Sequence, residues 1–167
     1  MSAGANLSWE EPTGCSPALH TWLRQHFARD DSRGPDRQPA SLSPILVVED
    51  DFLVAMQVEA TLSDAGFTLA GTAASAEEAI ALAVSQRPGL VLMDIRLAGK
   101  RDGVDAALEL FRDHGIRCIF ATAHHDADVR KRAAPARPLG WLQKPYTMSG
   151  LIIAVRKALD ELDQETD

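Results

Sequence analysis

Short apolar runs alternate with amphipathic segments along most of this chain. Five runs rich in large apolar or β-branched side chains indicate strands, at residues 45–48, 68–73, 90–94, 117–121 and 139–142. The first and third runs are apolar at nearly every position, which is typical of strands buried on both faces of a parallel sheet. The first run leads directly into acidic residues and the third ends in one.

The segments between these runs carry the period of amphipathic helices. The period is clearest in the first and last segments, at Val54, Val58 and Leu62 and at Leu151, Val155, Leu159 and Leu162. Ser75 and Glu78 have the spacing of a capping box, and Asp102 and Asp105 flank the start of the next helix. A short helix beginning near residue 126 should end at Pro135.

Five strands that alternate with five helices predict an α/β fold, with helices on both faces of one parallel sheet. Crossovers in such sheets are right-handed. A domain of this size commonly adopts the doubly wound, flavodoxin-like (βα)5 arrangement with strand order 2-1-3-4-5. In that order the first and third strands are neighbours, and the switch point of the sheet lies between them.

The first part of the chain differs in composition from the rest. Residues 1–43 are rich in Pro, Ser, Gly and Asp, and we interpret them as an N-terminal extension before a domain at 44–162 and a tail at 163–167. A serine followed by a proline can begin a short helix over residues 17–28. Two interpretations of that helix stay open: it docks on the domain or a partner, or it frays.

Composition excludes several classes of protein. The chain of 167 residues suits one domain, and its net charge of -7 argues against direct binding to nucleic acid or anionic lipid. No apolar run approaches the roughly 20 residues that span a bilayer, and no signal peptide is visible, so we expect a cytoplasmic protein. Cys15 and Cys118 lack metal-type spacing, and Cys118 should pack as a small apolar residue.

Acidic residues follow the two strands on either side of the predicted switch point. Glu49 and Asp50 follow the first strand, and Asp94 ends the third. Because the carboxyl ends of parallel strands meet at one edge, these carboxylates should converge there. They would repel one another and raise their pKa values unless a cation joined them. Mg²⁺ suits this arrangement because it binds one or two carboxylates, keeps several waters and shares phosphate oxygens.

The fourth and fifth strands bring complementary groups to the same edge. Thr122 supplies a hydroxyl, Ala123 leaves room beside it, and Lys144 supplies an ammonium. Together with the acids these groups fit phosphoryl transfer to a carboxylate: Asp94 attacks, and a metal and a cation neutralise the phosphoryl oxygens. Glu49 would act on the metal through a water, and Thr122 and Lys144 would bind the phosphoryl oxygens.

Four stretches in this order resemble the receiver domain of two-component response regulators. They are Ile45–Asp51 (ILVVEDD), Leu92–Asp94, Ala121–Ala123 and Lys144–Pro145, and the resemblance covers roughly residues 44–162. It implies a phosphoprotein of a phosphorelay, whose aspartate accepts a phosphoryl group from a phosphohistidine on a sensor histidine kinase or phosphotransfer protein.

The resemblance also implies individual roles. Glu49 and Asp50 would form the acidic pair that holds Mg²⁺ beside Asp94, and the main-chain carbonyl of Arg96 would be a further metal ligand. Thr122 and Lys144 would sense the phosphoryl group. The Lys144–Pro145 peptide bond is expected to be cis, as in the family, and to aim the lysine.

One position departs from the family pattern, and two others tune the chemistry. Trp141 stands three residues before the lysine, where the family usually has Tyr or Phe that swings inward on activation. The larger ring would swing partially, stay in one place, or simply pack in the fifth strand. Arg96 and His124 lie two residues after Asp94 and Thr122, at positions that border the path of attacking water and tune the lifetime of the phosphoryl group.

Residues 94–99, 120–122 and 138–145 are similar to stand-alone regulators of alphaproteobacteria, which are often served by kinases of the HWE type. We therefore expect a single-domain response regulator that acts through a protein partner or as a phosphate sink and is not an enzyme in its own right. A homodimer through the face of the fourth helix, fifth strand and fifth helix is a further expectation.

Two alternative functions fit part of the same pattern. A Mg²⁺-dependent phosphohydrolase with an aspartyl-phosphate intermediate would typically carry a second aspartate two residues after the nucleophile, where this chain has Arg96. An interaction module that no longer accepts phosphate is disfavoured because the full set of five residues is present: Glu49, Asp50, Asp94, Thr122 and Lys144.

Overall fold

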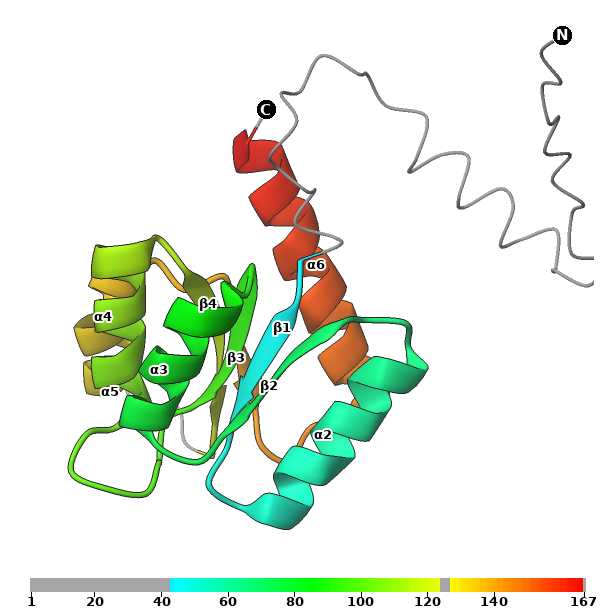
Figure 1. Cartoon of the computed structure of the whole chain (residues 1–167), viewed down its shortest axis with the longest axis horizontal. Coiled ribbons are helices and arrows are strands. Elements are labelled where there is room, and N and C mark those ends of the chain that lie inside the picture. Colours follow the sequence, from blue (N-terminus) through cyan, green and yellow to red (C-terminus); the bar gives the residue numbers. More distant parts are fainter. Residues whose placement is uncertain (1–42, 124–126, 167) are drawn as a thin grey trace, which may run out of the picture. The chain divides into compact units, whose positions relative to one another are not determined.

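A computed structural model describes residues 43–123 and 127–166, which form an α/β domain (Figure 1). In chain order its elements are β1 (Ile45–Val48), α2 (Phe52–Asp64), β2 (Leu69–Ala73), α3 (Ala76–Gln86), β3 (Leu90–Asp94), α4 (Gly103–His114), β4 (Arg117–Thr122), α5 (Ala127–Ala133), the 3-10 turn η2 (Ala134–Ala136), β5 (Gly140–Gln143) and α6 (Met148–Thr166). The predicted extension and its helix at 17–28 lie outside the described residues.

The sheet is parallel with strand order β2-β1-β3-β4-β5, which confirms the predicted fold. Val48 pairs with Met93, and Asp94 pairs with Ala121, so neighbouring strands end almost level. The residues that follow these strands therefore meet at one edge of the sheet. This register brings polar side chains from distant parts of the chain close together.

Helices cover both faces of the sheet, because alternate strand residues point to opposite sides and each side must be buried. One apolar core joins β-strand residues to α3, α4 and α5, and a second joins them to α2 and α6. Figure 1 shows the same division, with α3, α4 and α5 together on one side and α2 and α6 on the other. In the described part of the chain, no helix is long and apolar enough to cross a membrane.

Side-chain caps start three of the helices. The Asp51 carboxylate accepts from the backbone N–H groups of the first turn of α2, and Asp102 forms a reciprocal capping box with Asp105 at α4. Ser75 caps α3, but the predicted capping box with Glu78 is incomplete. The Glu78 carboxylate accepts from the N–H of Ala74, one residue earlier than that motif requires.

A buried arginine anchors the amino end of β4. The Arg117 guanidinium donates to the carbonyl oxygen of Arg137 at 2.7 Å and pairs with Glu161 and Glu165 of α6. These contacts help explain why α6 continues to Thr166, past residue 162. The neighbouring Cys118 is buried as predicted, and burial raises the pKa of its thiol to about 12.

The start of α4 lies directly against the end of β3. The Gly103 N–H donates to the carbonyl oxygen of Ile95 at 2.8 Å. A Cβ at position 103 would lie only 1.9 Å from the carbonyl oxygen of Asp94 and 2.9 Å from its carbonyl carbon. Both clashing atoms belong to the backbone, so neither can move away as a side chain would. Only glycine allows α4 to approach Asp94 this closely.

Gly103→Ala should therefore destabilise the domain by about 2 kcal/mol or more, because the added methyl group forces the backbone of α4 away from β3. Urea denaturation measures the loss in free energy of unfolding. Gly140→Ala is the matched control: its Cβ would meet Ile119 Cγ2 at 3.9 Å, an ordinary contact. Equal losses in the two variants would contradict the close approach.

Candidate functional site

Three carboxylates gather at the carboxyl edge of the sheet. Glu49 and Asp50 follow β1, Asp94 is the last residue of β3, and one carboxylate oxygen from each lies within 4.8 Å of the other two. Glu49 and Asp94 are buried, whereas Asp50 is exposed. Hard carboxylate oxygens at this spacing are the donors that Mg²⁺ takes, with room for waters on the exposed side. The donor set fits the ion that the sequence implies.

Lys144 joins two of these carboxylates. Its ammonium donates to Glu49 Oε2 at 2.6 Å and to Asp94 Oδ2 at 2.7 Å. The lysine follows β5, and its backbone N–H donates to the carbonyl oxygen of Thr122 at 2.7 Å, which sets the start of the side chain beside β4. The Lys144–Pro145 bond is cis, as predicted.

The Lys144 cation does not fully offset the burial of Glu49. Burial raises the pKa of Glu49 above its ordinary value, and the nearby charge of Asp94 adds to this, although the hydrogen bond from Lys144 acts the other way. Burial alone would lower the pKa of Lys144, but its hydrogen bonds to Asp94 and Glu49 outweigh that effect and raise the pKa. The lysine therefore stays charged at neutral pH.

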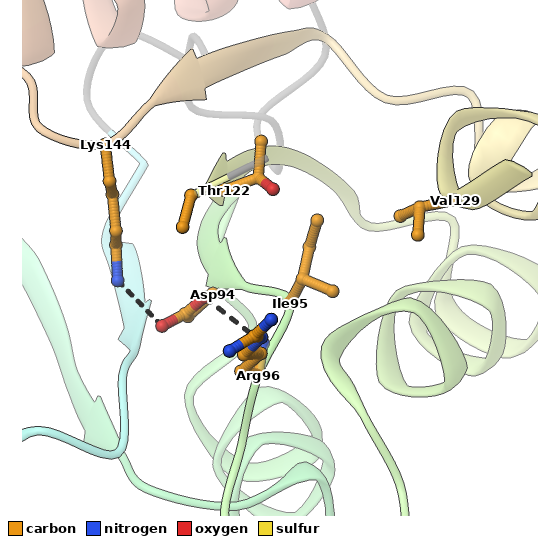
Figure 2. A pocket seen from close by; sticks show the side chains of 7 residues that line it. Asp94, Ile95, Arg96, Thr122, Val129 and Lys144 are labelled. Atoms are coloured by element: carbon orange, nitrogen blue, oxygen red, sulfur yellow. Dashed lines mark hydrogen bonds and ion pairs between the residues drawn. The ribbon is translucent and has the colours of Figure 1, made fainter. Parts of the chain in front are cut away.

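Asp94 opens into a cavity of about 350 Å³. The cavity is lined by residues from the ends of β3, β4 and β5 and from α5: Asp94, Ile95, Arg96, Thr122, Ala123, Val129 and Lys144. Figure 2 shows Lys144 and Arg96 on opposite sides of the Asp94 carboxylate. On the second side, the backbone N–H of Arg96 donates to Asp94 Oδ1 at 3.2 Å. Both carboxylate oxygens of Asp94 are thus oriented.

The structure brings the five central residues of the sequence analysis to one place. Thr122 is buried at the end of β4 and, with Ala123, faces the same cavity as Asp94 and Lys144. Glu49 and Asp50 complete the group from β1. Their assigned roles, and that of the Arg96 carbonyl as a metal ligand, stay predictions.

Trp141 lies outside the set of residues that lines this cavity. Its ring stacks on Phe120 of β4, with centroids 4.8 Å apart, and the Arg130 guanidinium lies 4.6 Å from its centroid. His124 lies outside the described residues.

Sequence reasoning missed three contributors to this site. Ile95 and Val129 form part of the cavity wall, and Gly103 allows α4 to approach Asp94. A signal existed for Gly103, because glycine in the first turn of a helix is unfavourable without a packing reason. No signal existed for Val129, since α5 is too short to show a helical period.

Comparison with known proteins agrees with this geometry. A family model described as response regulator receiver domain matches residues 45–156. Transcriptional regulatory protein PdtaR of Mycobacterium tuberculosis is 33% identical over 122 residues, which are 73% of this chain and 59% of PdtaR. Phyllosphere-induced regulator PhyR of Methylorubrum extorquens is 32% identical over 131 residues, which are 77% of this chain and 48% of PhyR. The chain therefore spans about half the length of these relatives.

Solved structures show the same fold. The signal receiver domain of a modulated diguanylate cyclase from Desulfovibrio desulfuricans G20 has a TM-score of 0.69 at 32% identity, and the match covers 74% of this chain and 98% of that one. A CheY-like receiver domain protein from Methanospirillum hungatei JF-1 has a TM-score of 0.68 at 24% identity, covering 75% and 99% of the two chains. At that identity the second likeness supports the fold alone.

Lys144→Met should raise the pKa of Glu49 further, because the hydrogen bond and the positive charge that lower it are lost. The folded variant then holds a proton that the unfolded chain releases near pH 4.5, so its stability falls as pH rises above 4.5 toward the raised pKa. Across this pH range, we expect the free energy of unfolding of the variant to fall by on the order of 1 kcal/mol more than that of the wild type.

Urea denaturation without divalent cations, together with carbon NMR titration of the Glu49 carboxyl group, measures both effects. Lys157→Met removes an exposed lysine of α6 and serves as the control. The same pH dependence in the wild type and the Lys144 variant would contradict the coupling.

Proposed function

This chain belongs to the family of response regulator receiver domains, and we propose that it accepts a phosphoryl group on Asp94 from a phosphohistidine. The protein would act in the cytoplasm, and the donor would be a sensor histidine kinase or a phosphotransfer protein. The likeness of residues 94–99, 120–122 and 138–145 to regulators often served by HWE kinases favours a kinase of that type. The observation that carries the proposal is the position of Asp94: it is the one carboxylate of the acidic group that also lines the cavity with Thr122 and Lys144.

The proposed transfer forms one bond and breaks one. An Asp94 carboxylate oxygen attacks phosphorus, and the phosphorus–nitrogen bond to the imidazole breaks as the acyl-phosphate bond forms. The electron pair of the broken bond returns to the ring, which leaves as neutral imidazole because its other nitrogen carries a proton. Lys144 and the Thr122 hydroxyl would then donate to the phosphoryl oxygens, and Ala123 leaves them space.

Mg²⁺, held by Glu49, Asp50 and Asp94 with the main-chain carbonyl of Arg96, would supply the positive charge that lets phosphoryl and carboxylate oxygens approach. The protein's own part is orientation. Hydrogen bonds from the backbone N–H of Arg96 and from Lys144 hold Asp94, and that geometry exists before any donor arrives.

The proposed output is a change in conformation that a downstream protein reads. Thr122 lines the cavity at the end of β4, and α5 is the next helix along the chain. Movement of Thr122 toward a phosphoryl group would therefore reach the face formed by α5, β5 and α6, where we also place a homodimer contact. Arg96 and His124 would set the lifetime of the phosphoryl group. A short lifetime with no partner would make the protein a phosphate sink. In either role it acts stoichiometrically, without turnover of a separate substrate.

An exposed apolar surface beside the site supports docking of a protein donor. Phe52, Leu53 and Met56 of α2 are 72%, 73% and 50% exposed. They belong to the first turns of the helix that directly follows Glu49, Asp50 and the capping Asp51. Exposed apolar side chains that are grouped, as these are within two turns of one helix, favour a protein contact. A donor seated there would hold its phosphohistidine near Asp94.

The proposal is tested by labelling with acetyl phosphate and with an autophosphorylated sensor histidine kinase, both in the presence of Mg²⁺. We expect about one acid-stable, base-labile phosphoryl group per wild-type chain, and none in Asp94→Asn, because the amide is not a nucleophile. Chelation of divalent ions should remove the labelling. Asp51→Asn is the matched control at the same edge, since asparagine caps α2 equally well.

Absence of label in the wild type, or equal labelling in Asp94→Asn, would overturn the assignment. Sustained release of inorganic phosphate from an excess of varied phosphate esters would instead favour the phosphohydrolase alternative. These outcomes are separated by measuring phosphate release in the same reactions.

Leu53→Asp should lower the rate of transfer from the kinase about tenfold, because it places a charge in the apolar contact with the donor. Labelling by acetyl phosphate should be unchanged, since that donor needs no docking surface. Val84→Asp is the control, because Val84 of α3 is also exposed, at 54%. If Leu53→Asp and Val84→Asp transfer alike, the donor does not dock on this part of α2.

A further inference from the structure

Helix α5 is held to the domain by little apolar burial. Of its residues Ala127–Ala133, only Ala133 is buried, and Val129 is partly buried against the core. By contrast, α4 buries Gly103, Val104, Ala106, Ala107 and Leu110. A helix this short is not stable by itself in water, so other contacts must hold it.

Two arginines of α5 make those contacts, and they reach in different directions. The Arg130 guanidinium lies over the ring of Trp141 in β5, 4.6 Å from its centroid. Trp141 in turn stacks on Phe120, its direct partner in the sheet register. The Arg132 guanidinium donates to the carboxylate of Asp102, the N-cap of α4. Residues two apart in a helix do not face the same way, so the two arginines tie α5 to two separate supports.

The helix that makes these two contacts also borders the phosphoacceptor cavity. Val129 of α5 and Thr122 at the end of β4 line that cavity (Figure 2). Ala123, the next residue along the chain, lines it as well. Helix α5 begins at Ala127, a few residues after Thr122. A shift of Thr122 toward a phosphoryl group on Asp94 therefore acts on the chain that leads directly into α5, and α5 can follow only if its contacts give way.

We propose that Arg130 and Arg132 form a double latch that holds α5 in its resting position and so limits how readily Asp94 accepts a phosphoryl group. This inference rests on the proposed function. In this proposal the Trp141 ring stays in place, stacked on Phe120, and supports Arg130. If resting and activated positions of α5 are in equilibrium, a contact made only in the resting position lowers the apparent affinity of the site for a phosphoryl group.

For loss of either arginine, the latch and simple electrostatics predict opposite changes in the affinity of the site for an anion. Removing a positive charge near an anion site weakens anion binding. Removing a latch contact should strengthen binding, because a larger fraction of molecules is then in the activated position. Lys131 lies between the two arginines and is exposed, so its neutralisation reports the effect of charge alone.

The probe is beryllofluoride with Mg²⁺, which mimics a phosphoryl group on a carboxylate, titrated by calorimetry and by fluorine NMR into the full chain. Arg130→Gln and Arg132→Gln should each tighten binding about 2- to 5-fold, the range expected for one exposed cation–π contact or ion pair, and the double variant should tighten it more. Lys131→Gln should leave affinity unchanged or slightly weaker.

Asp102→Asn tests the latch from outside α5. Asparagine retains the cap of α4 but lacks the charge that Arg132 binds. Loss of a negative charge alone would also favour an anion, so the decisive comparison is with the double variant Asp102→Asn/Arg132→Gln. That variant should bind no tighter than Arg132→Gln if both changes break the same contact, and tighter binding would assign the effect to charge. Circular dichroism and urea denaturation monitor the fold of each variant.

Equal or weaker binding in Arg130→Gln, Arg132→Gln and Asp102→Asn, or equal tightening in Lys131→Gln, would overturn the latch alone. Failure of the wild type to bind beryllofluoride would overturn the proposed function on which the latch rests. The two failures are therefore distinguishable in one set of titrations.

Discussion

The contact of one ammonium with two buried carboxylates places strict demands on this domain. Glu49 directly follows β1 and Asp94 ends the adjacent β3, whereas Lys144 directly follows β5 at the edge of the sheet. The three groups meet only if the strands have this order and end nearly level. The same ammonium that offsets repulsion between the acids is available to a phosphoryl group, so stability and proposed chemistry depend on one arrangement.

Two helices next to Asp94 are held in different ways. Helix α4 is fixed by a well-buried apolar face, and Gly103 brings it into contact with the Asp94 backbone. Helix α5 is held by two arginine contacts, one buried alanine and the partly buried Val129. Elements with little buried apolar surface move most readily. Rigid packing of α4 thus positions Asp94, while the less buried α5 can respond to what binds in the cavity.

Much of the fold could be predicted because its signals are local. Strand β3 is recognisable from five consecutive residues, and α4 from the capping Asp102 directly before its first residue. The meeting of Glu49, Asp94 and Lys144 was also predictable. Alternation of strands and helices implies a parallel sheet, and residues at the carboxyl ends of its strands share one edge. Ser75 and Glu78 show the limit of local spacing, since the carboxylate bonds one residue away from the expected position.

The sequence by itself determined the strands, the helices, their order and the acidic and basic groups at the carboxyl edge, since these follow from periodicity, capping and the small repertoire of parallel sheets. Only the tertiary structure decided that Arg130 covers Trp141, that Arg132 reaches Asp102 and that Val129 joins the wall of the cavity. Those contacts depend on the separation of elements far apart in the chain. They also depend on which of many rotamers a long side chain adopts, and no residue spacing encodes either quantity.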